Sequence, residues 1–394
     1  MGPHRVVTRV LNALPSLMVL IAIGTAWSHG LFERVSSATG EQPQSAGAPG
    51  FELDKSWPHV PEKWKLGFIS SVTVDAQDHV WVLHRPRTLP DADAAAAAPP
   101  VLEFDNAGNF IQAWGGPGTG YEWPEREHGI SVDYKGNVWI GGNNYPARLD
   151  RGLKRVSDDQ LLKFTRTGKL LMQLGRSNQS GGNADTKNFC QPTDVAVWPK
   201  TNEAFVADGY GNHRVIVIDA DTGAFKRMWG AFGNTPVDTP VRGPEIPPPS
   251  IPDDGGPGRP QFDIVHAIRI SNDGLVYVAD REDKRVQVFT IDGKYVDQVY
   301  VRRSETSEPR TTSGLALSPG PRQQFLYASA LGGPNGQLVM LDRKSLKVVG
   351  AIGSREGFTG GHQMAADSKG NLYTAMGNRP SRFAYKKRVA DVGH

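Results

Sequence analysis

The sequence predicts an all-β protein, a six-bladed β-propeller preceded by an N-terminal signal or anchor segment. Three observations predict this fold. A unit of two short strands around a tight turn recurs six times, and most copies are followed by a second hairpin. Gly (45) and Pro (29) are abundant among the 394 residues, which suits many short strands joined by turns. Units of four antiparallel strands repeated around an axis form a propeller.

The N-terminus has the composition of a targeting segment. Arg5 and Arg9 precede a mostly apolar run over residues 10–27, which is typical of a signal peptide. The run lies near the lower limit for spanning a bilayer, and Gly24-Thr25-Ala26 is a weak cleavage site. We therefore expect residues 1–30 to be a signal peptide or a membrane anchor. Either form exports the protein to the periplasm or the extracellular space, and an uncleaved segment would hold it at the membrane.

The rest of the chain divides into a linker and one domain. Residues 31–55, rich in Ser, Gly, Ala, Pro and Gln, are expected to be a flexible linker. Residues 56–390 are expected to form the propeller, and no break separates the repeats. The net charge of +3 and the scattered Lys and Arg argue against a nucleic-acid partner. Cys190 is the single cysteine, so no intramolecular disulfide can form. We expect a monomer.

The repeated unit is a strand of alternating apolar residues, a turn and a second strand, as in REHGISVDYKGNVWIGG from Arg126. Its other copies begin at Ser70, Thr193, His266, Ser313 and His362. The third and fourth strands are joined by Asn-Ala-Gly, Arg-Thr-Gly or Ile-Asp-Gly, which favour hairpins. The sixth copy lacks a clear fourth strand. The segment KSWPHVPEKWKLG, residues 55–67, is predicted to supply it and so to remove an open sheet edge.

Histidines recur at one position of the unit. When the six copies are aligned on their first strand, one position, two places before the first inward apolar residue, holds either a hydroxyl residue or a histidine. The two types alternate along the chain, in the order Ser70, His128, Thr193, His266, Ser313 and His362. In a propeller the first strand of each blade lines the central channel, so these positions form a ring at one end of it. Three imidazoles that converge on an axis and leave a position open are typical of a catalytic zinc site. The sequence thus predicts a metal held by His128, His266 and His362.

The second strands return to the same mouth and end with three reactive residues, Arg85, Tyr210 and Arg281. Arginine binds a carboxylate through two parallel hydrogen bonds. A tyrosine beside a cation loses its proton more readily than a free one, so Tyr210 is a candidate general base. His84 and His213 lie near this face and are at most supporting residues. The alternative for each residue alone is an ordinary surface loop position.

Four segments, NFCQPTDVAV, FVADGYGNHRV, YVADREDKRVQVF and EHGISVDYKGNVWI, resemble the lyase domain of peptidylglycine amidating enzymes. That domain is peptidyl-α-hydroxyglycine α-amidating lyase, a six-bladed propeller of the NHL-repeat type. The resemblance covers nearly everything between Trp64 and Phe383 and is strongest between Gln160 and Val288. It implies a zinc ion on His128, His266 and His362, with Tyr210, Arg85 and Arg281 as catalytic residues.

This chain departs from the family at a calcium site and at a disulfide bridge. The resemblance implies a structural calcium, bound partly through the backbone carbonyl of Ile130. Directly after the third histidine, Gln363 replaces an aspartate that helps to hold this calcium in the family. A neutral amide is a poorer ligand for a hard cation, so whether this chain binds calcium is left open. The animal enzymes pair the cysteine of FCQP with one in a DGYC motif. Here Cys190 would face Gly211, and that bridge is absent.

The resemblance implies a zinc-dependent carbon–nitrogen lyase that cleaves a peptide or small-molecule carbinolamide, N–CH(OH)–carboxylate, to an amide and glyoxylate. Two alternatives stay open: a non-enzymatic NHL-propeller binding protein of the cell envelope, and a lactonase-like propeller hydrolase. Enlarged loops over residues 91–100, 144–159 and 239–260 are expected near the same mouth, either as a lid or as padding.

Overall fold

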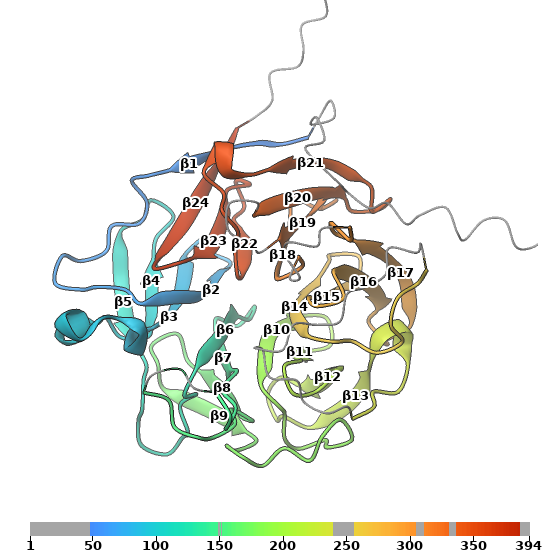
Figure 1. The fold of residues 1–394 in the computed structure, drawn as a ribbon, viewed down its shortest axis with the longest axis horizontal. Coiled ribbons are helices and arrows are strands. Elements are labelled where there is room, and N and C mark those ends of the chain that lie inside the picture. Colours follow the sequence, from blue (N-terminus) through green and yellow to red (C-terminus); the bar gives the residue numbers. More distant parts are fainter. Residues whose placement is uncertain are drawn as a thin grey trace, which may run out of the picture. The chain divides into compact units, whose positions relative to one another are not determined.

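The computed structural model describes residues 48–148, 150, 152–238, 256–304, 311–330 and 336–386. These residues form six four-stranded antiparallel sheets arranged as the blades of a propeller (Figure 1). The predicted all-β, six-bladed architecture is thereby confirmed. The expected signal or anchor over residues 1–30 lies outside the described residues. Within the described ranges, no helix has both the length and the apolar character needed to cross a bilayer.

The first three blades follow one another along the chain, each built from the inside outward. Blade 1 contains β2 (Phe68–Val74), β3 (Val80–Arg85), β4 (Val101–Phe104) and β5 (Phe110–Trp114). Blade 2 contains β6 (Glu127–Val132), β7 (Val138–Gly142), β8 (Leu161–Phe164) and β9 (Leu170–Leu174). Blade 3 contains β10 (Pro192–Trp198), β11 (Glu203–Asp208), β12 (Arg214–Asp219) and β13 (Phe225–Trp229).

The other three blades complete the ring. Blade 4 contains β14 (Val265–Ile270), β15 (Leu275–Asp280), β16 (Arg285–Thr290) and β17 (Tyr295–Tyr300). Blade 5 contains β18 (Gly314–Leu317), β19 (Phe325–Ala330), β20 (Gln337–Asp342) and β21 (Val348–Ile352). Blade 6 contains β22 (Met364–Ala366), β23 (Leu372–Met376), β24 (Arg379–Lys386) and β1 (Gly50–Asp54). Short 3₁₀ turns are η1 (Pro86–Thr88), η2 (Asp91–Ala96), η3 (Ala231–Gly233) and η5 (Ser354–Glu356).

The sixth blade is closed by an N-terminal strand, although not by the predicted one. β1 pairs with β24 in antiparallel register from Gly50 opposite Lys386 to Asp54 opposite Arg382. The prediction that residues 55–67 supply this strand was wrong. The alternation of apolar and polar residues in GFELD, residues 50–54, is too short to indicate a strand beside the aromatic-rich segment that follows it. The sheet thus begins inside the range 31–55 that we expected to be a linker.

A recurring aspartate explains why the first hairpin of a blade forms. In blade 2 the Asp133 Oδ1 atom accepts hydrogen bonds from the backbone N–H groups of Lys135 and Asn137, both at 2.9 Å. Its Oδ2 atom accepts one from the Trp139 indole at 3.1 Å. Gly136 completes the turn at φ +81°, which a glycine adopts without strain. Blades 1 and 6 repeat the arrangement with Asp75 and Trp81, and with Asp367 and Tyr373.

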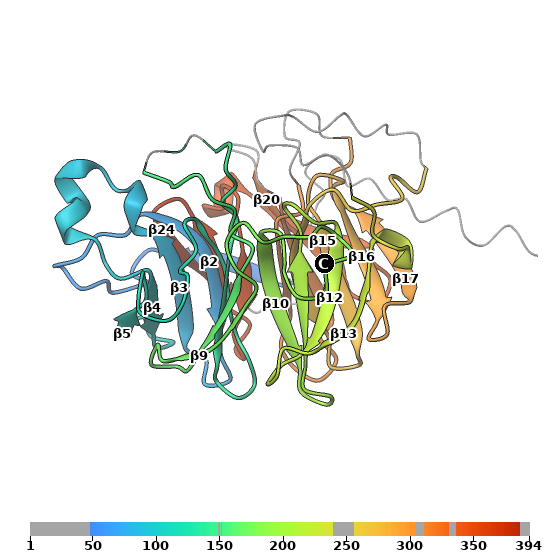
Figure 2. The same cartoon turned by 90° about the horizontal axis from the view of Figure 1, so that it is seen from below.

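The apolar core lies between neighbouring blades. Between blades 1 and 2, Trp81 and Leu83 pack with Ile130 and Ile140, and all four are buried. The innermost strands β2, β6, β10, β14, β18 and β22 surround the axis (Figure 1). Figure 2 shows β2 and β10 from the side, running along it. Because these strands all run in the same direction, their first residues meet at one end of the channel.

Candidate metal and catalytic site

Three histidines meet at that end of the channel. His128 lies in β6, His266 in β14, and His362 two residues before β22. The imidazole centroids of the three pairs lie 4.6 to 4.8 Å apart, and the Nε2 atoms of His128 and His266 lie 3.2 Å apart. Their nitrogen atoms form a cluster able to hold one metal ion. The structure therefore brings together the three histidines that the repeat alignment selected.

Local irregularities of the strands turn two of these residues toward the axis. The pairing of β6 with β7 skips one residue between Glu127 and Gly129, and the pairing of β14 with β15 skips one between Val265 and Ala267. The skipped residues are His128 and His266. Such bulges leave a residue out of the ladder and re-aim its side chain. The strands of blades 1 and 3 skip Ser70 and Thr193 in the same way.

The hydroxyl residues between the histidines have a defined role. Each imidazole Nδ1 atom lies within hydrogen-bonding distance of the backbone carbonyl oxygen of the hydroxyl residue in the next blade. The pairs are His128 with Thr193 at 3.1 Å, His266 with Ser313 at 2.6 Å, and His362 with Ser70 at 2.6 Å. A carbonyl oxygen only accepts, so each Nδ1 atom carries the proton. Outer contacts of this kind fix the tautomer and orientation of metal-ligating histidines.

This tautomer leaves three Nε2 lone pairs facing one another. Burial, followed by the charges of His362 and His266, lowers the pKa of His128 well below its usual value. Burial, followed by the charge of Arg85, does the same to the pKa of His362. Both imidazoles are therefore neutral, the form that binds a metal. Two zinc ligands at about 2.0–2.1 Å in tetrahedral geometry lie roughly 3.4 Å apart, close to the observed 3.2 Å. The donor set fits zinc.

The residue preceding each histidine is also fixed. Its backbone carbonyl accepts a hydrogen bond from a side chain of the blade before it: Thr193 Oγ1 to Val265 at 2.7 Å, Ser313 Oγ to Gly361 at 2.8 Å, and Arg85 Nε to Glu127 at 2.7 Å. At the junction of blades 1 and 2 an arginine thus takes the place of a hydroxyl group. This substitution places the Arg85 guanidinium beside the histidines.

Gly129 is a residue that sequence reasoning missed. A Cβ atom at this position would lie 1.9 Å from the Thr193 carbonyl oxygen, the same oxygen that accepts from His128. Only glycine lets the two blades approach closely enough for that hydrogen bond. The signal was present as the glycine directly after the histidine in EHGI.

Tyr210 and Arg281 lie together against the histidines. The Arg281 Nη1 atom donates to the Tyr210 phenol oxygen at 2.8 Å, and that oxygen lies 3.2 Å from His128 Nε2. The Nη2 atom of Arg281 donates to Glu282 Oε1 at 2.7 Å. Burial alone lowers the pKa of Arg281, but its interactions with Tyr210 and Glu282 outweigh burial, and the pKa rises. The guanidinium is therefore a permanent cation at the Tyr210 oxygen.

Arg85 also lies beside the triad, next to Phe68. Its side chain is 3 % exposed, and its Cζ atom lies 5.2 Å from the centre of the Phe68 ring. The Phe68 ring in turn meets His362 edge to face, with centroids 6.2 Å apart. The Nη2 atom of Arg85 is buried and has no hydrogen-bond partner among the described residues. Buried donors without partners are costly, so this group is suited to an anion.

Two further arginines, which the sequence did not single out, lie beside Arg85. Arg87 and Arg126 line the same pocket as Arg85. Arg126 is held by Asn143 Oδ1 at 2.7 Å and by Asp150 Oδ2 at 3.1 Å. The signal was the spacing of Arg126 two residues before His128.

Asp158 anchors the segment that carries Arg126. Its buried carboxylate accepts backbone N–H bonds from Glu125, Arg126 and Asn144 at 2.8 to 3.0 Å. Burial raises the pKa of Asp158 to about 7, against the opposing effect of these three donors. The residue lies in the enlarged loop over 144–159, so part of that loop supports the site. Of the loop over 239–260, residues 239–255 lie outside the described ranges.

The two supporting histidines hold backbone rather than the metal cluster. His84 accepts from the Gly67 N–H at 3.1 Å, and its other nitrogen lies 3.0 Å from the Pro99 carbonyl oxygen. Burial lowers its pKa to about 4. The Nδ1 atom of His213 lies 3.2 Å from the Asp263 carbonyl oxygen.

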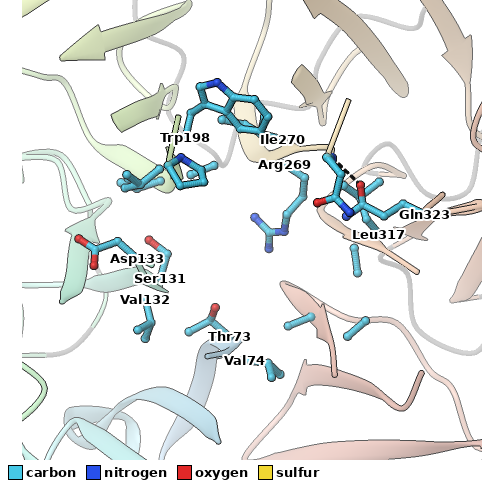
Figure 3. A pocket seen from close by; sticks show the side chains of 18 residues that line it. Thr73, Val74, Ser131, Val132, Asp133, Trp198, Arg269, Ile270, Leu317 and Gln323 are labelled. Carbon is cyan, nitrogen blue, oxygen red and sulfur yellow. Dashed lines mark hydrogen bonds between the residues drawn. The ribbon is translucent and has the colours of Figure 1, made fainter. Parts of the chain in front are cut away.

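The residues farther along the channel do not fit a calcium ion. The Gln363 amide Nε2 atom donates to the His266 carbonyl oxygen at 2.9 Å and so offers no charge. Arg269 enters the channel from β14 (Figure 3), where it donates to Asp194 Oδ2 at 2.5 Å and to the Met364 carbonyl oxygen at 3.0 Å. A guanidinium beside residue 363 repels a divalent cation. Among the residues that the structure describes, no group of carboxylates able to hold a metal lies around Ile130.

A second group of possible metal ligands is neutralised by an arginine. Asp75, His79 and Glu103 come together in blade 1. The Arg166 guanidinium pairs with Asp75 at 2.8 Å and also contacts Glu103 and His79. A bound cation would have to displace this arginine, so we assign the group no metal.

Comparisons with known proteins agree with the fold. The family model described as NHL repeat matches residues 189–218 and 262–289. The chain is 28 % identical over 363 residues to peptidyl-glycine alpha-amidating monooxygenase B of Xenopus laevis, covering 85 % of this chain and 36 % of the relative. It is 30 % identical over 166 residues to a probable peptidyl-alpha-hydroxyglycine alpha-amidating lyase of Caenorhabditis elegans, covering 41 % and 36 %.

The name of a third relative states no enzymatic activity. The human NHL repeat-containing protein 3 is 26 % identical over 248 residues, covering 61 % of this chain and 57 % of the relative. The chain spans between about a quarter and a third of the length of the amidating monooxygenases that it matches.

Proposed function

Because this chain is an NHL-repeat propeller related to the amidating lyases, we propose that it is a zinc-dependent carbon–nitrogen lyase. Its substrate is a carbinolamide, N–CH(OH)–carboxylate, of a peptide or a small molecule, and its products are an amide and glyoxylate. The proposal includes export through residues 1–30.

One observation carries the proposal. All three histidines donate through Nδ1 to backbone carbonyls, so their Nε2 lone pairs face one another at the axis. Two such lone pairs at 3.2 Å repel unless a cation lies between them. A propeller that only binds a partner has no use for this arrangement. A lactonase-like calcium site needs anionic oxygens, which the three histidines do not offer.

His128, His266 and His362 would hold the zinc, which when bound supplies Lewis-acid polarisation of the substrate hydroxyl. Tyr210 takes the hydroxyl proton through its phenol oxygen, and the Arg281 hydrogen bond to that oxygen stabilises the charge it carries. The electron pair of the O–H bond forms the aldehyde C=O as the C–N bond breaks. Tyr210, now protonated, returns the proton to the leaving nitrogen, so that the atoms balance.

The two arginines act on the carboxylate side of the substrate. Arg85 offers a buried Nη2 donor without a partner among the described residues, and it binds the carboxylate that becomes glyoxylate. Arg281 is held in place by Glu282 and stabilises charge that develops during the reaction.

A glyoxylate-release assay on α-hydroxyhippurate tests the proposal. We expect turnover by the purified protein, its loss after chelation, recovery with zinc, and about one zinc per chain by elemental analysis. His266→Ala is expected to lose both the zinc and the activity. His79→Ala, in the group of Asp75, His79 and Glu103 that Arg166 occupies, is the matched control and should keep both. Absence of glyoxylate from a zinc-loaded protein would contradict the proposal.

The non-enzymatic binding protein is the second candidate, since the human NHL repeat-containing protein 3 is also a relative. Metal analysis separates the candidates. A protein that folds normally and takes up no zinc at all would favour the binding module.

A further inference from the structure

A pocket of about 460 Å³ opens beside the histidines on the side of Arg85. Phe68 forms part of its wall and touches His362 edge to face, so the pocket adjoins the metal cluster. Arg85, Arg87, Arg126 and Asp150 are its charged lining residues, and the others are apolar, neutral polar or glycine. Three guanidiniums against one carboxylate leave an excess of two positive charges.

Asp150, the one carboxylate among the lining residues, does not satisfy the arginines around it. One oxygen of Asp150, Oδ2, is shared between Arg126 at 3.1 Å, Arg148 at 3.6 Å and Arg87 at 3.9 Å. Only the first of these contacts has hydrogen-bond length. The Arg148 side chain is 7 % exposed and also packs its guanidinium over the Tyr145 ring, 4.6 Å from the centroid.

Several guanidinium nitrogens here are buried without a hydrogen-bond partner among the described residues. They are Nη2 of Arg85, Nε and Nη2 of Arg87, and Nε of Arg148. Buried cationic donors left without a hydrogen bond are costly, and those of Arg85 and Arg87, which line the pocket, are suited to an anion. Arginine forks match planar oxyanions. The proposed reaction uses one anion, the carboxylate at Arg85, which leaves Arg87 without a role.

Resting on the proposed function, we infer that this pocket binds a second carboxylate, on the acyl side of the substrate. The natural substrate is then a dianionic carbinolamide, an N-acyl hydroxyglycine whose acyl group ends in a carboxylate. Arg87 binds that second carboxylate, and Arg126, fixed by Asn143 and Asp150, adds positive charge behind it. The class is an acidic acyl group small enough for the pocket, rather than a long neutral peptide.

Two matched substrates test this inference. They are α-hydroxyhippurate with a para-carboxylate and its neutral, isosteric para-carboxamide. We expect kcat/KM to be at least 10-fold higher for the carboxylate, because a hydrogen bond to a charged group contributes about 1.5–3 kcal/mol and a 10-fold difference needs only about 1.4 kcal/mol. In Arg87→Gln the ratio of the two kcat/KM values should fall to about 1. Lys135→Gln removes the same charge in the turn between β6 and β7 and should leave the ratio as it is. Equal kcat/KM values in the native protein would overturn the inference.

A binding measurement keeps the inference separate from the proposed lyase activity. The corresponding N-aroyl glycines lack the hydroxyl group and cannot be cleaved. Calorimetry should show the para-carboxylate binding at least 10-fold more tightly than the carboxamide, with the difference lost in Arg87→Gln. This result supports the pocket even if no glyoxylate is released, and equal affinities overturn it. Inorganic phosphate should compete with the para-carboxylate more strongly than with the carboxamide. Equal inhibition of both would indicate a free-anion site and would also overturn the inference.

Discussion

The Nδ1 atom of His266 lies 2.6 Å from the backbone carbonyl oxygen of Ser313 in the next blade. The same relationship joins His362 to Ser70 and His128 to Thr193. The histidines and the hydroxyl residues that alternate around the ring therefore act together in one structural arrangement. Every second blade supplies a ligand, and the blade after it supplies the carbonyl that orients this ligand.

Replacement of Gly129 should weaken the metal site without removing a ligand. In Gly129→Ala the new Cβ atom would push away the Thr193 carbonyl, because the two would lie 1.9 Å apart. His128 then loses its orienting hydrogen bond, and loss of such a contact costs about 10- to 100-fold in metal affinity. Zinc competition with a chromophoric chelator measures the change. Gly136→Ala, in the exposed turn of the same blade, is the control. Unaltered zinc affinity in Gly129→Ala would contradict the orienting role.

Loss of the phenol group should reduce catalysis and leave the metal in place. In Tyr210→Phe we expect kcat to fall about 10²- to 10⁴-fold, the range for a general acid–base group, with zinc content near one per chain. Tyr145→Phe, whose ring packs under Arg148, is expected to change kcat little. Full turnover by Tyr210→Phe would remove the base assignment.

Asp158 should matter for stability because it holds three backbone N–H groups away from solvent. In Asp158→Asn one acceptor oxygen becomes an NH₂ group that faces N–H donors. We expect a loss of about 1–3 kcal/mol in the free energy of unfolding, measured by urea titration. The exposed Asp91 in η2, replaced by Asn, serves as the comparison. A destabilisation below about 0.5 kcal/mol would show that water replaces the lost contact.

The closing strand should lose stability in acid. Hydrogen bonds from Ser56, and then the contact with Arg382, lower the pKa of Asp54 to about 2. Since this pKa lies below the unfolded value of about 3.9, the ionised form stabilises the fold above about pH 4. That contribution is lost as the pH falls toward 2. The free energy of unfolding of Asp54→Asn should therefore depend less on pH across this window than that of the native protein. Parallel curves would contradict the linkage.

Cys190 and Gly211 are close enough for an engineered bridge. A Cβ atom on Gly211 would lie 2.1 Å from the Cys190 sulfur and 2.9 Å from the Cys190 Cβ atom, so the two backbones must move apart by roughly 0.6–1 Å to reach the Cβ···Cβ separation of about 3.5–4.5 Å that a disulfide spans. Burial, and then the charges of Asp159 and Asp208, raise the pKa of the native thiol to about 12, so oxidation is expected to be slow. Once formed, a disulfide closing a loop of this length stabilises by about 3 kcal/mol. Thiol counting and the melting temperature of Gly211→Cys, with and without reductant, measure both effects. Two free thiols after oxidation would contradict the geometry.

The sequence by itself determined the propeller, because alternation and turn residues act over a few neighbouring positions and six copies repeat the same signal. It also selected the three histidines, since equivalent positions of a closed ring must face one axis. Tertiary structure decided the rest. The bulges that aim the histidines, the approach of Gly129 to Thr193 and the entry of Arg269 into the channel depend on contacts between blades. The closing strand was mislocated because five residues of weak alternation become a strand only beside β24. The arginine pocket, likewise, joins residues from separate loops whose proximity no local pattern encodes.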